Sequence, residues 1–324
     1  MKQDSVPTAG PAQPPEARVG GGAGLGLALA LVSAFSFGVS GPFAKALLDL
    51  GWTPSAAVLV RITGAALVLL LLVATTQRGY WRTIRADASP ILLCGALAMA
   101  GVQVCYFSAV QHLPVSVALL LEYLAPTLVV LWVWLVRGRR PSAMTLVGGA
   151  VALVGLGFVV DVFSGADLRW AGLLWGLGSA VCQACYFLVA DRADTKTNPV
   201  VFTAASTAVA ALVVALLGLV GVLRITFPTA PGPVSIGGVD AHWLVPALVL
   251  VLVSGVSAYL TGIMAIARLG ATRASLVALS EVVFAALVAW LLLAESPTIW
   301  QVVGGALILV GIALSRSGDE RRAG

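Results

Sequence analysis

The feature that most constrains the fold is a succession of apolar runs, each about 20 residues long, separated by short polar segments. A run of this length crosses a hydrocarbon layer of about 30 Å as a helix. The runs do not alternate between apolar and polar residues, so they predict helices and not the strands of a membrane barrel. Only 10% of the 324 residues are charged, against about 25% in soluble domains. The sequence therefore predicts an all-α polytopic membrane protein.

The apolar runs predict ten transmembrane helices. Their expected ranges are 23–46, 55–76, 90–110, 116–136, 143–162, 171–190, 199–221, 243–265, 274–293 and 299–316. The proline-rich residues 1–20 are expected to form a disordered cytoplasmic tail, residues 317–324 a second tail, and residues 222–242 the one long loop.

The distribution of lysine and arginine predicts the orientation of the chain. With both termini in the cytoplasm, the inner segments carry fifteen basic residues: Lys2, Arg18, Arg78, Arg82, Arg85, Arg137, Arg139, Arg140, Arg192, Lys196, Arg268, Arg273, Arg316, Arg321 and Arg322. The outer loops carry only Arg169 and Arg224. Because basic residues concentrate in cytoplasmic loops, we expect a multi-pass protein of the cytoplasmic membrane with both termini inside. Its basic charge belongs to loops, and no nucleic-acid surface is expected.

An internal repeat relates the two halves of the chain. The segment VGGAVALVG at 147–155 returns as VGGALILVG at 303–311, with seven of nine positions identical at an offset of 156 residues. Each half then holds five predicted spans. Because five is odd, the halves must have opposite orientations in the membrane, which is the inverted-repeat plan of secondary transporters.

This arrangement resembles the EamA-type transporters of the drug/metabolite transporter superfamily. The similarity covers roughly residues 23–316, and its best-matching segment is RLGATRASLVALSEVVFAALVAWLLLAE at 268–295. It implies one EamA-like repeat at 21–162 and another at 163–316. It also implies export of small metabolites such as amino acids by alternating access without a cofactor, by a monomer or a homodimer. The segment LLLEYLAP at 119–126 is similar to one in threonine/homoserine exporters of the same superfamily.

Four charged residues of the predicted spans are singled out as functional candidates: Lys45, Arg61, Glu122 and Glu281. A charge at the centre of a membrane helix costs about 2.5–3.5 kcal/mol on insertion scales, so such residues should face the protein interior or a wet cavity. From their positions along the spans, Lys45, Arg61 and Glu122 are expected in one cluster in the outer half of the membrane. Glu281 is expected in the inner half, without a cation at its depth. Glu295 is expected to be solvated at the outer edge.

Two interpretations remain open for each of these groups. Glu122 either pairs with Arg61 or Lys45 and fixes helix packing, or lines a cavity where it binds a substrate amine or exchanges a proton. Arg61 either anchors helices or captures a substrate carboxylate. Glu281 either couples transport to protons or hydrogen-bonds a neighbouring helix. The repeat aligns Ala125, not Glu122, with Glu281, so the two glutamates are not symmetry equivalents.

Two prolines interrupt predicted spans. Pro126 has no N–H for the carbonyl of Glu122, and Pro42 loosens the preceding turn of the first span in the same way. Freed carbonyls beside a cavity are typical of transporter sites. Several aromatic residues are candidates for the wall of such a cavity, with plain packing as the alternative: Phe37, Tyr106, Tyr123, Tyr186 and Tyr259.

The leading hypothesis is a secondary transporter that exports amino acids or related compounds, with proton antiport as the candidate mechanism. Efflux of cationic drugs is the alternative transport hypothesis. A membrane-embedded enzyme for lipid substrates is disfavoured, because His112 and His242 fall in predicted outer loops and no acidic cluster has metal-ligand spacing. The CxxC pair Cys182 and Cys185 is interpreted as small packing residues, with no metal expected.

Overall fold

A computed structural model describes residues 22–138, 142–159, 169–190, 197–228, 232–269, 274 and 277–323. The expected tail at 1–20 lies outside these residues. Helices dominate the described chain, in agreement with an all-α membrane protein. Six of them are long and apolar enough to cross a membrane, and three shorter apolar helices accompany them in the same described segments.

The helices of the first half follow the predicted spans. In chain order they are α1 (Gly22–Gly38), α2 (Ser40–Asp49), α3 (Pro54–Thr76), α4 (Tyr80–Ala86), α5 (Ala88–Leu93), the π-helical segment η1 (Cys94–Gly101), α6 (Val102–Val110), α7 (Val115–Glu122), α8 (Ala125–Arg137) and α9 (Ala143–Val159). The short helix α4 was not predicted.

The second half consists of α10 (Trp170–Ala190), α11 (Pro199–Leu219), strands β1 (Val234–Ile236) and β2 (Val239–Ala241), α12 (Leu244–Leu248), the π-helical segment η2 (Val249–Ser257), α13 (Ala258–Leu269), α15 (Ser280–Leu293) and α16 (Ile299–Ala323). The two strands pair antiparallel inside the expected loop 222–242. Gly237 and Gly238 both have positive φ at their turn, as a tight hairpin with the native strand twist requires.

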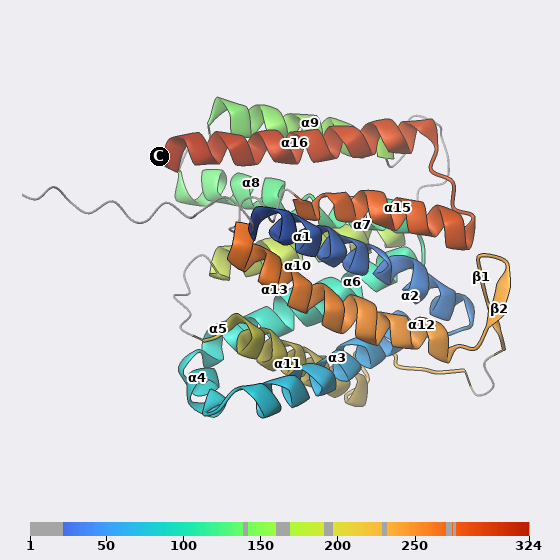
Figure 1. Ribbon diagram of the computed structural model, residues 1–324. Coiled ribbons are helices and arrows are strands. Elements are labelled where there is room, and N and C mark those ends of the chain that lie inside the picture. Colours follow the sequence, from blue (N-terminus) through green and yellow to red (C-terminus); the bar gives the residue numbers. More distant parts are fainter. Residues whose placement is uncertain are drawn as a thin grey trace, which may run out of the picture.

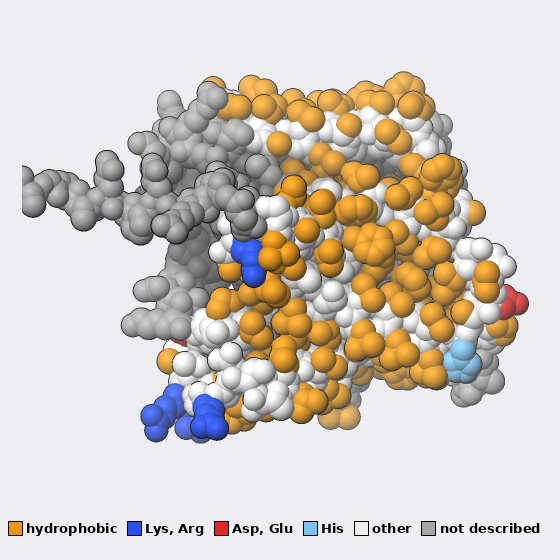
Figure 2. All heavy atoms as spheres, viewed as in Figure 1, with side chains coloured by type: hydrophobic (Ala, Val, Ile, Leu, Met, Phe, Trp, Pro, Cys, Tyr) orange, Lys and Arg blue, Asp and Glu red, His pale blue; other side chains and the backbone are white. Residues whose placement is uncertain are grey.

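The long helices lie side by side as a bundle with two distinct ends (Figure 1). We call the end that carries β1 and β2 the hairpin end, and the end where α1 begins and α16 ends the terminus end. Apolar side chains cover the flank of the bundle, while charged side chains gather at its ends (Figure 2). Exposed Arg78, Arg82 and Arg85 lie around α4, and exposed Asp240 lies in the hairpin. This surface suits a chain surrounded by lipid with its two ends in water.

Both prolines stand where a helix is interrupted. The first predicted span is divided into α1 and α2 at Val39, three residues before Pro42, and the fourth is divided into α7 and α8 after Glu122. Glu122 is the residue whose carbonyl Pro126 leaves without a helical donor. The fourth span is thus divided at the residue whose carbonyl lacks a helical partner because Pro126 has no N–H.

The π-helical segments were not predicted. η1 lies between α5 and α6, and η2 lies between α12 and α13, so each interrupts one predicted span. Adding the repeat offset of 156 to the bounds of η1 gives 250–257, which is η2 to within one residue. π-helical turns often occur at functional sites, and both segments lie near the cavity described below.

Helices α9 and α16 pack through the repeated glycines. A Cβ atom added at Gly155 would lie 2.6 Å from the carbonyl oxygen of Gly304, and one added at Gly311 would lie 2.5 Å from that of Gly148. The repeat offset of 156 residues relates Gly155 to Gly311 and Gly148 to Gly304, so the two contacts are equivalent with the helices interchanged. As the chain number falls from 155 to 148 its partner rises from 304 to 311, so the two helices are antiparallel.

This contact predicts a position-specific effect on stability. Gly155→Val should destabilise the fold by about 1–3 kcal/mol, because the side chain would collide with the backbone of α16 and overpack the seam. Gly157 lies on the same helix with nothing within 4 Å of a built Cβ, so Gly157→Val is the matched control. Thermal melting of the purified protein in detergent measures both. Equal melting temperatures for the two variants would contradict the close packing of α9 and α16.

Candidate functional site

The bundle contains a cavity of about 390 Å³ lined by residues from both halves of the chain. The lining residues are Phe37, Ser40, Arg61, Cys94, Ala98, Met99, Val102, Gln103, Tyr106, Leu119, Glu122, Tyr123, Ala125, Pro126, Gln183, Tyr259, Ala278 and Glu281. They include three of the four charged residues singled out in the sequence. The volume is that of a small-molecule site, and ligand pockets of this kind combine apolar walls with few polar groups.

Arg61 is the most buried charge at the cavity. Its side chain comes from α3 and is 2% exposed. One guanidinium nitrogen, Nη1, donates to Ser40 Oγ at 2.8 Å and to Gln103 Oε1. The other, Nη2, donates to the backbone oxygen of Ser254 at 3.0 Å. A buried cation needs such partners because it has lost its water, so Arg61 ties α2, α6 and η2 to α3.

Glu122 ends α7, directly before the interruption caused by Pro126. Its Oε2 accepts a hydrogen bond of 2.8 Å from Ser179 Oγ on α10. No ion pair joins Glu122 to Arg61 or Lys45 among the residues that the structure describes. The helix-pairing interpretation of Glu122 therefore has no cation to support it in the described chain.

Glu281 lies in the first turn of α15, where the helix dipole favours a carboxylate. Its Oε2 accepts a hydrogen bond of 3.0 Å from the hydroxyl of Tyr123, which also lies 3.0 Å from the backbone oxygen of Ala278. The expectation of a separate depth is wrong: Glu281 lines the same cavity as Glu122 and Arg61. The interruption between α7 and α8 places Tyr123 beside α15.

The cavity wall also contains the other aromatic candidates whose side chains are described. Tyr106 and Tyr259 line it together with Phe37, and the rings of Phe37 and Tyr259 meet edge to face with centroids 5.1 Å apart. The Tyr186 side chain lies outside the described residues.

Lys45 lies away from the cavity, and its expected cluster with Arg61 and Glu122 does not form. Its Nζ is instead paired with Glu295 Oε1, and Glu295 Oε2 accepts a hydrogen bond of 3.1 Å from the backbone nitrogen of Val115. The expectation that Glu295 is solvated is therefore also wrong, since its side chain is only 18% exposed. Pro42 interrupts the first span without lining the cavity.

Several polar residues of the site were not singled out in the sequence. They are Ser40, Gln103, Ser179, Gln183 and Ser254. A signal was available for the two glutamines, because an amide inside an apolar span needs a partner or a wet cavity. Gln183 stands between the two cysteines of the VCQAC motif, and the motif was interpreted from its cysteines alone.

The network around Arg61 predicts a loss of stability in the absence of any substrate. Arg61→Met should lower the free energy of unfolding by about 3–5 kcal/mol, because removal of one partner leaves buried polar groups without their hydrogen bonds. Arg268→Met is the control, since Arg268 is exposed and, within the described part of the chain, donates to the backbone oxygen of Met264 on its own helix. Thermal melting in substrate-free detergent distinguishes the two. An unchanged melting temperature of Arg61→Met would mean that Arg61 does not anchor the helices, and would favour a role in substrate binding alone.

Comparisons with known proteins agree with this geometry. The chain is 28% identical to the inner membrane transporter YicL of Salmonella typhimurium over 74% of its own length and 76% of that protein. It is 30% identical to a probable terminal-alkyne amino-acid exporter of Streptantibioticus cattleyicolor over 79% of this chain and 82% of that one. Its 28% identity to the threonine/homoserine exporter RhtA of Escherichia coli spans about half of each chain, 54%.

A crystal structure superposes on the bundle with a TM-score of 0.58 at 20% identity, covering 94% of this chain and 99% of that one. This likeness concerns the fold. The sequence profile of the EamA-like transporter family matches the chain twice, at residues 24–161 and 170–317. The protein belongs to the EamA-like transporter family, and is a multi-pass membrane transporter.

Proposed function

We propose that this transporter exports amino acids or related small compounds across the cytoplasmic membrane by alternating access, in exchange for protons. The observation that carries the proposal is one cavity that holds a guanidinium and two carboxylates among apolar and aromatic walls. The names of two relatives, the threonine/homoserine exporter and the terminal-alkyne amino-acid exporter, support the substrate class.

The charges of the cavity suit a zwitterion. Glu122 and Glu281 are candidates to receive the substrate ammonium group, because their partners among the described residues are the hydroxyls of Ser179 and Tyr123 and not cations. Arg61 uses three of its five N–H groups on Ser40, Gln103 and Ser254 within the described chain. In this proposal the other two would bind a substrate carboxylate at the cavity wall.

Exchange for protons would use the same carboxylates. A carboxylate in a site with little water tends to hold a proton, and it must release that proton before it can pair with the ammonium group of a substrate. Binding of substrate and of protons would then exclude each other at Glu122 and Glu281, which is the requirement for antiport. Tyr106, Tyr123 and Tyr259 would form the aromatic walls around the substrate side chain.

The proposed architecture is ten transmembrane helices in two inverted repeats, 21–162 and 163–316, with both termini in the cytoplasm. Two observations support it. The reciprocal glycine contacts are those expected of two antiparallel helices related by a twofold axis perpendicular to them, and such an axis would lie in the membrane plane if both helices cross the membrane. The offset that relates those glycines also relates η1 to η2. Interchange of the two repeats' conformations would give access from alternate sides.

Transport into everted vesicles under an imposed proton gradient tests the function. Wild-type protein should accumulate labelled amino acids such as threonine, and Glu281→Gln should abolish gradient-driven uptake while exchange of labelled for unlabelled substrate continues. Glu122→Gln should weaken substrate binding, raising the concentration needed for half-maximal uptake by about tenfold or more for one lost charge-assisted contact.

Asp240→Asn is the matched control, because it removes one exposed carboxylate from the hairpin, far from the cavity lining. It should transport like wild type at equal expression. If both glutamate variants also transport like wild type, the assignment of coupling to Glu122 and Glu281 fails.

Efflux of cationic compounds is a second candidate. It is favoured by the absence of a cation beside Glu122 among the described residues, since a cationic substrate would supply one. A labelled organic cation replaces the amino acid in the same vesicles. Accumulation of the cation without accumulation of any amino acid would decide for this alternative.

A further inference from the structure

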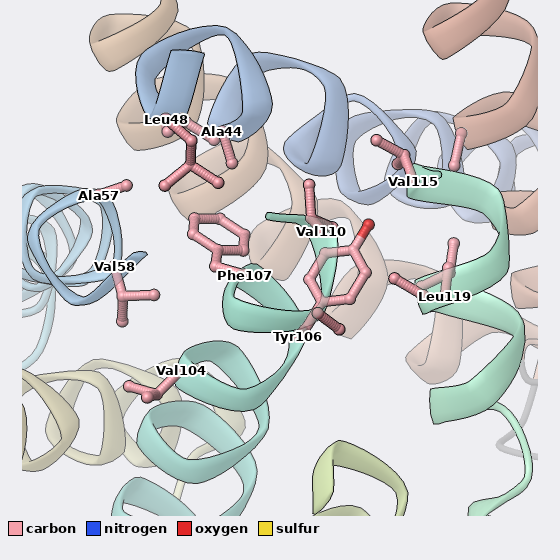
Figure 3. Close-up of a cluster of buried hydrophobic side chains, with 14 of the residues drawn as sticks. Ala44, Leu48, Ala57, Val58, Val104, Tyr106, Phe107, Val110, Val115 and Leu119 are labelled. Carbon is pink, nitrogen blue, oxygen red and sulfur yellow. The ribbon is translucent and has the colours of Figure 1, made fainter. Parts of the chain in front are cut away.

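The passage between the cavity and the hairpin end is closed by tightly packed side chains. Ser40 of α2 lines the cavity, and Lys45 lies five residues further along the chain, about 7.5 Å away along a helix. Between them, Ala44 is fully buried, as are Val110 and Val115 from the neighbouring segments. Figure 3 shows these side chains converging with Tyr106 and Leu119 in one apolar layer.

Gly41 makes this layer tight. A Cβ atom added at Gly41 would collide with Val115 Cγ1 and with the hydroxyl oxygen of Tyr106. The side chains of Tyr106 on α6 and Val115 at the start of α7 therefore pack directly against the backbone of α2 at this level. Tyr106 and Leu119 also line the cavity, so the layer is the wall of the cavity on the side of the hairpin end.

An ionic contact lies immediately beyond this layer. Lys45 of α2 pairs with Glu295, which follows α15, and Glu295 also accepts the hydrogen bond from the backbone nitrogen of Val115 at the start of α7. Three segments that are distant in sequence are thus joined at one carboxylate. The N-terminus of α7 adds the positive end of its dipole to the attraction.

From this geometry we infer that Lys45, Glu295 and the amide of Val115 form a latch that holds the cavity shut toward the hairpin end, over a seal made by Gly41, Tyr106 and Val115. The inference rests on the alternating access proposed above. The Lys45 and Glu295 side chains are 25% and 18% exposed, and ion pairs with access to water contribute modestly to stability. The latch can therefore break in each transport cycle, and α2 can then move away from α6 and α7.

Labelling of a single cysteine in the cavity tests the latch without substrate. In a variant whose four native cysteines are replaced by serine, Ala98→Cys places a thiol in the cavity lining. A membrane-impermeant maleimide is applied to intact cells, where the hairpin end faces outward in the proposed orientation. We expect slow labelling of this background, and a several-fold faster rate after Lys45→Met or Glu295→Gln.

The charge-swapped double variant Lys45→Glu with Glu295→Lys restores the ion pair but not the acceptor for the Val115 amide, so its labelling rate should lie between that of the single variants and that of the background. In Gly41→Ala the added methyl group would collide with Val115 and Tyr106 and force α2 away from them. This variant should therefore label faster than the background even with the ion pair intact. Arg224→Met removes an exposed charge from the long loop near the same end and should change nothing. A separate Asp240→Cys variant verifies that the hairpin is reached from outside.

Labelling of Lys45→Met and Glu295→Gln at the background rate would overturn the latch. The labelling rate is measured without substrate, so it tests the latch separately from the proposed function. If Lys45→Met and Glu295→Gln label faster while no amino acid is transported, the latch is supported and the proposed function is overturned. If amino acids are transported but the labelling rate does not change in these variants, the proposed function is supported and the latch is overturned.

Discussion

The hydrogen bonds of Arg61 are the interaction on which the cavity depends. A guanidinium placed in the middle of an apolar bundle must find acceptors there, and it finds them on α2, α6 and η2 at once. Ser40 and Gln103 line the cavity with Arg61, so the cation helps to hold together the helices that enclose it. One buried charge thereby serves both as a support for the fold and as a source of positive potential in the cavity.

The interruptions of the helices supply the polar groups around that charge. The division of the fourth span leaves the carbonyl of Glu122 free of its helical donor and directs Tyr123 toward Glu281. In η2 the carbonyl of Ser254 becomes a partner of Arg61. Backbone irregularity in a membrane protein is tolerated only where protein or water satisfies it, and the Arg61 side chain satisfies the carbonyl of Ser254.

Much of this was predictable because apolar runs and the cost of buried charge are local properties of a sequence. They located the helices, the proline interruptions, and Arg61, Glu122 and Glu281. Partners were not predictable: Lys45 and Glu295 are 250 residues apart, and only the folded chain brings them together. The π-helical segments depend on a hydrogen-bond register that side-chain patterns do not specify. The hairpin did carry a signal, because Gly237-Gly238 is flanked by alternating residues, but the loop's prolines obscured it.

The contact between α9 and α16 explains why the internal repeat is most exact in these two helices. Among the residues whose side chains are described, neither helix contributes to the cavity lining, and each presents its glycines to the other in the same way. Two copies of a segment that perform the same task on each other remain under the same demand, so VGGAVALVG and VGGALILVG still match. The segments around the cavity face a cargo that has no twofold symmetry. There the repeat is less exact, and Glu281 of the second copy aligns with Ala125 of the first.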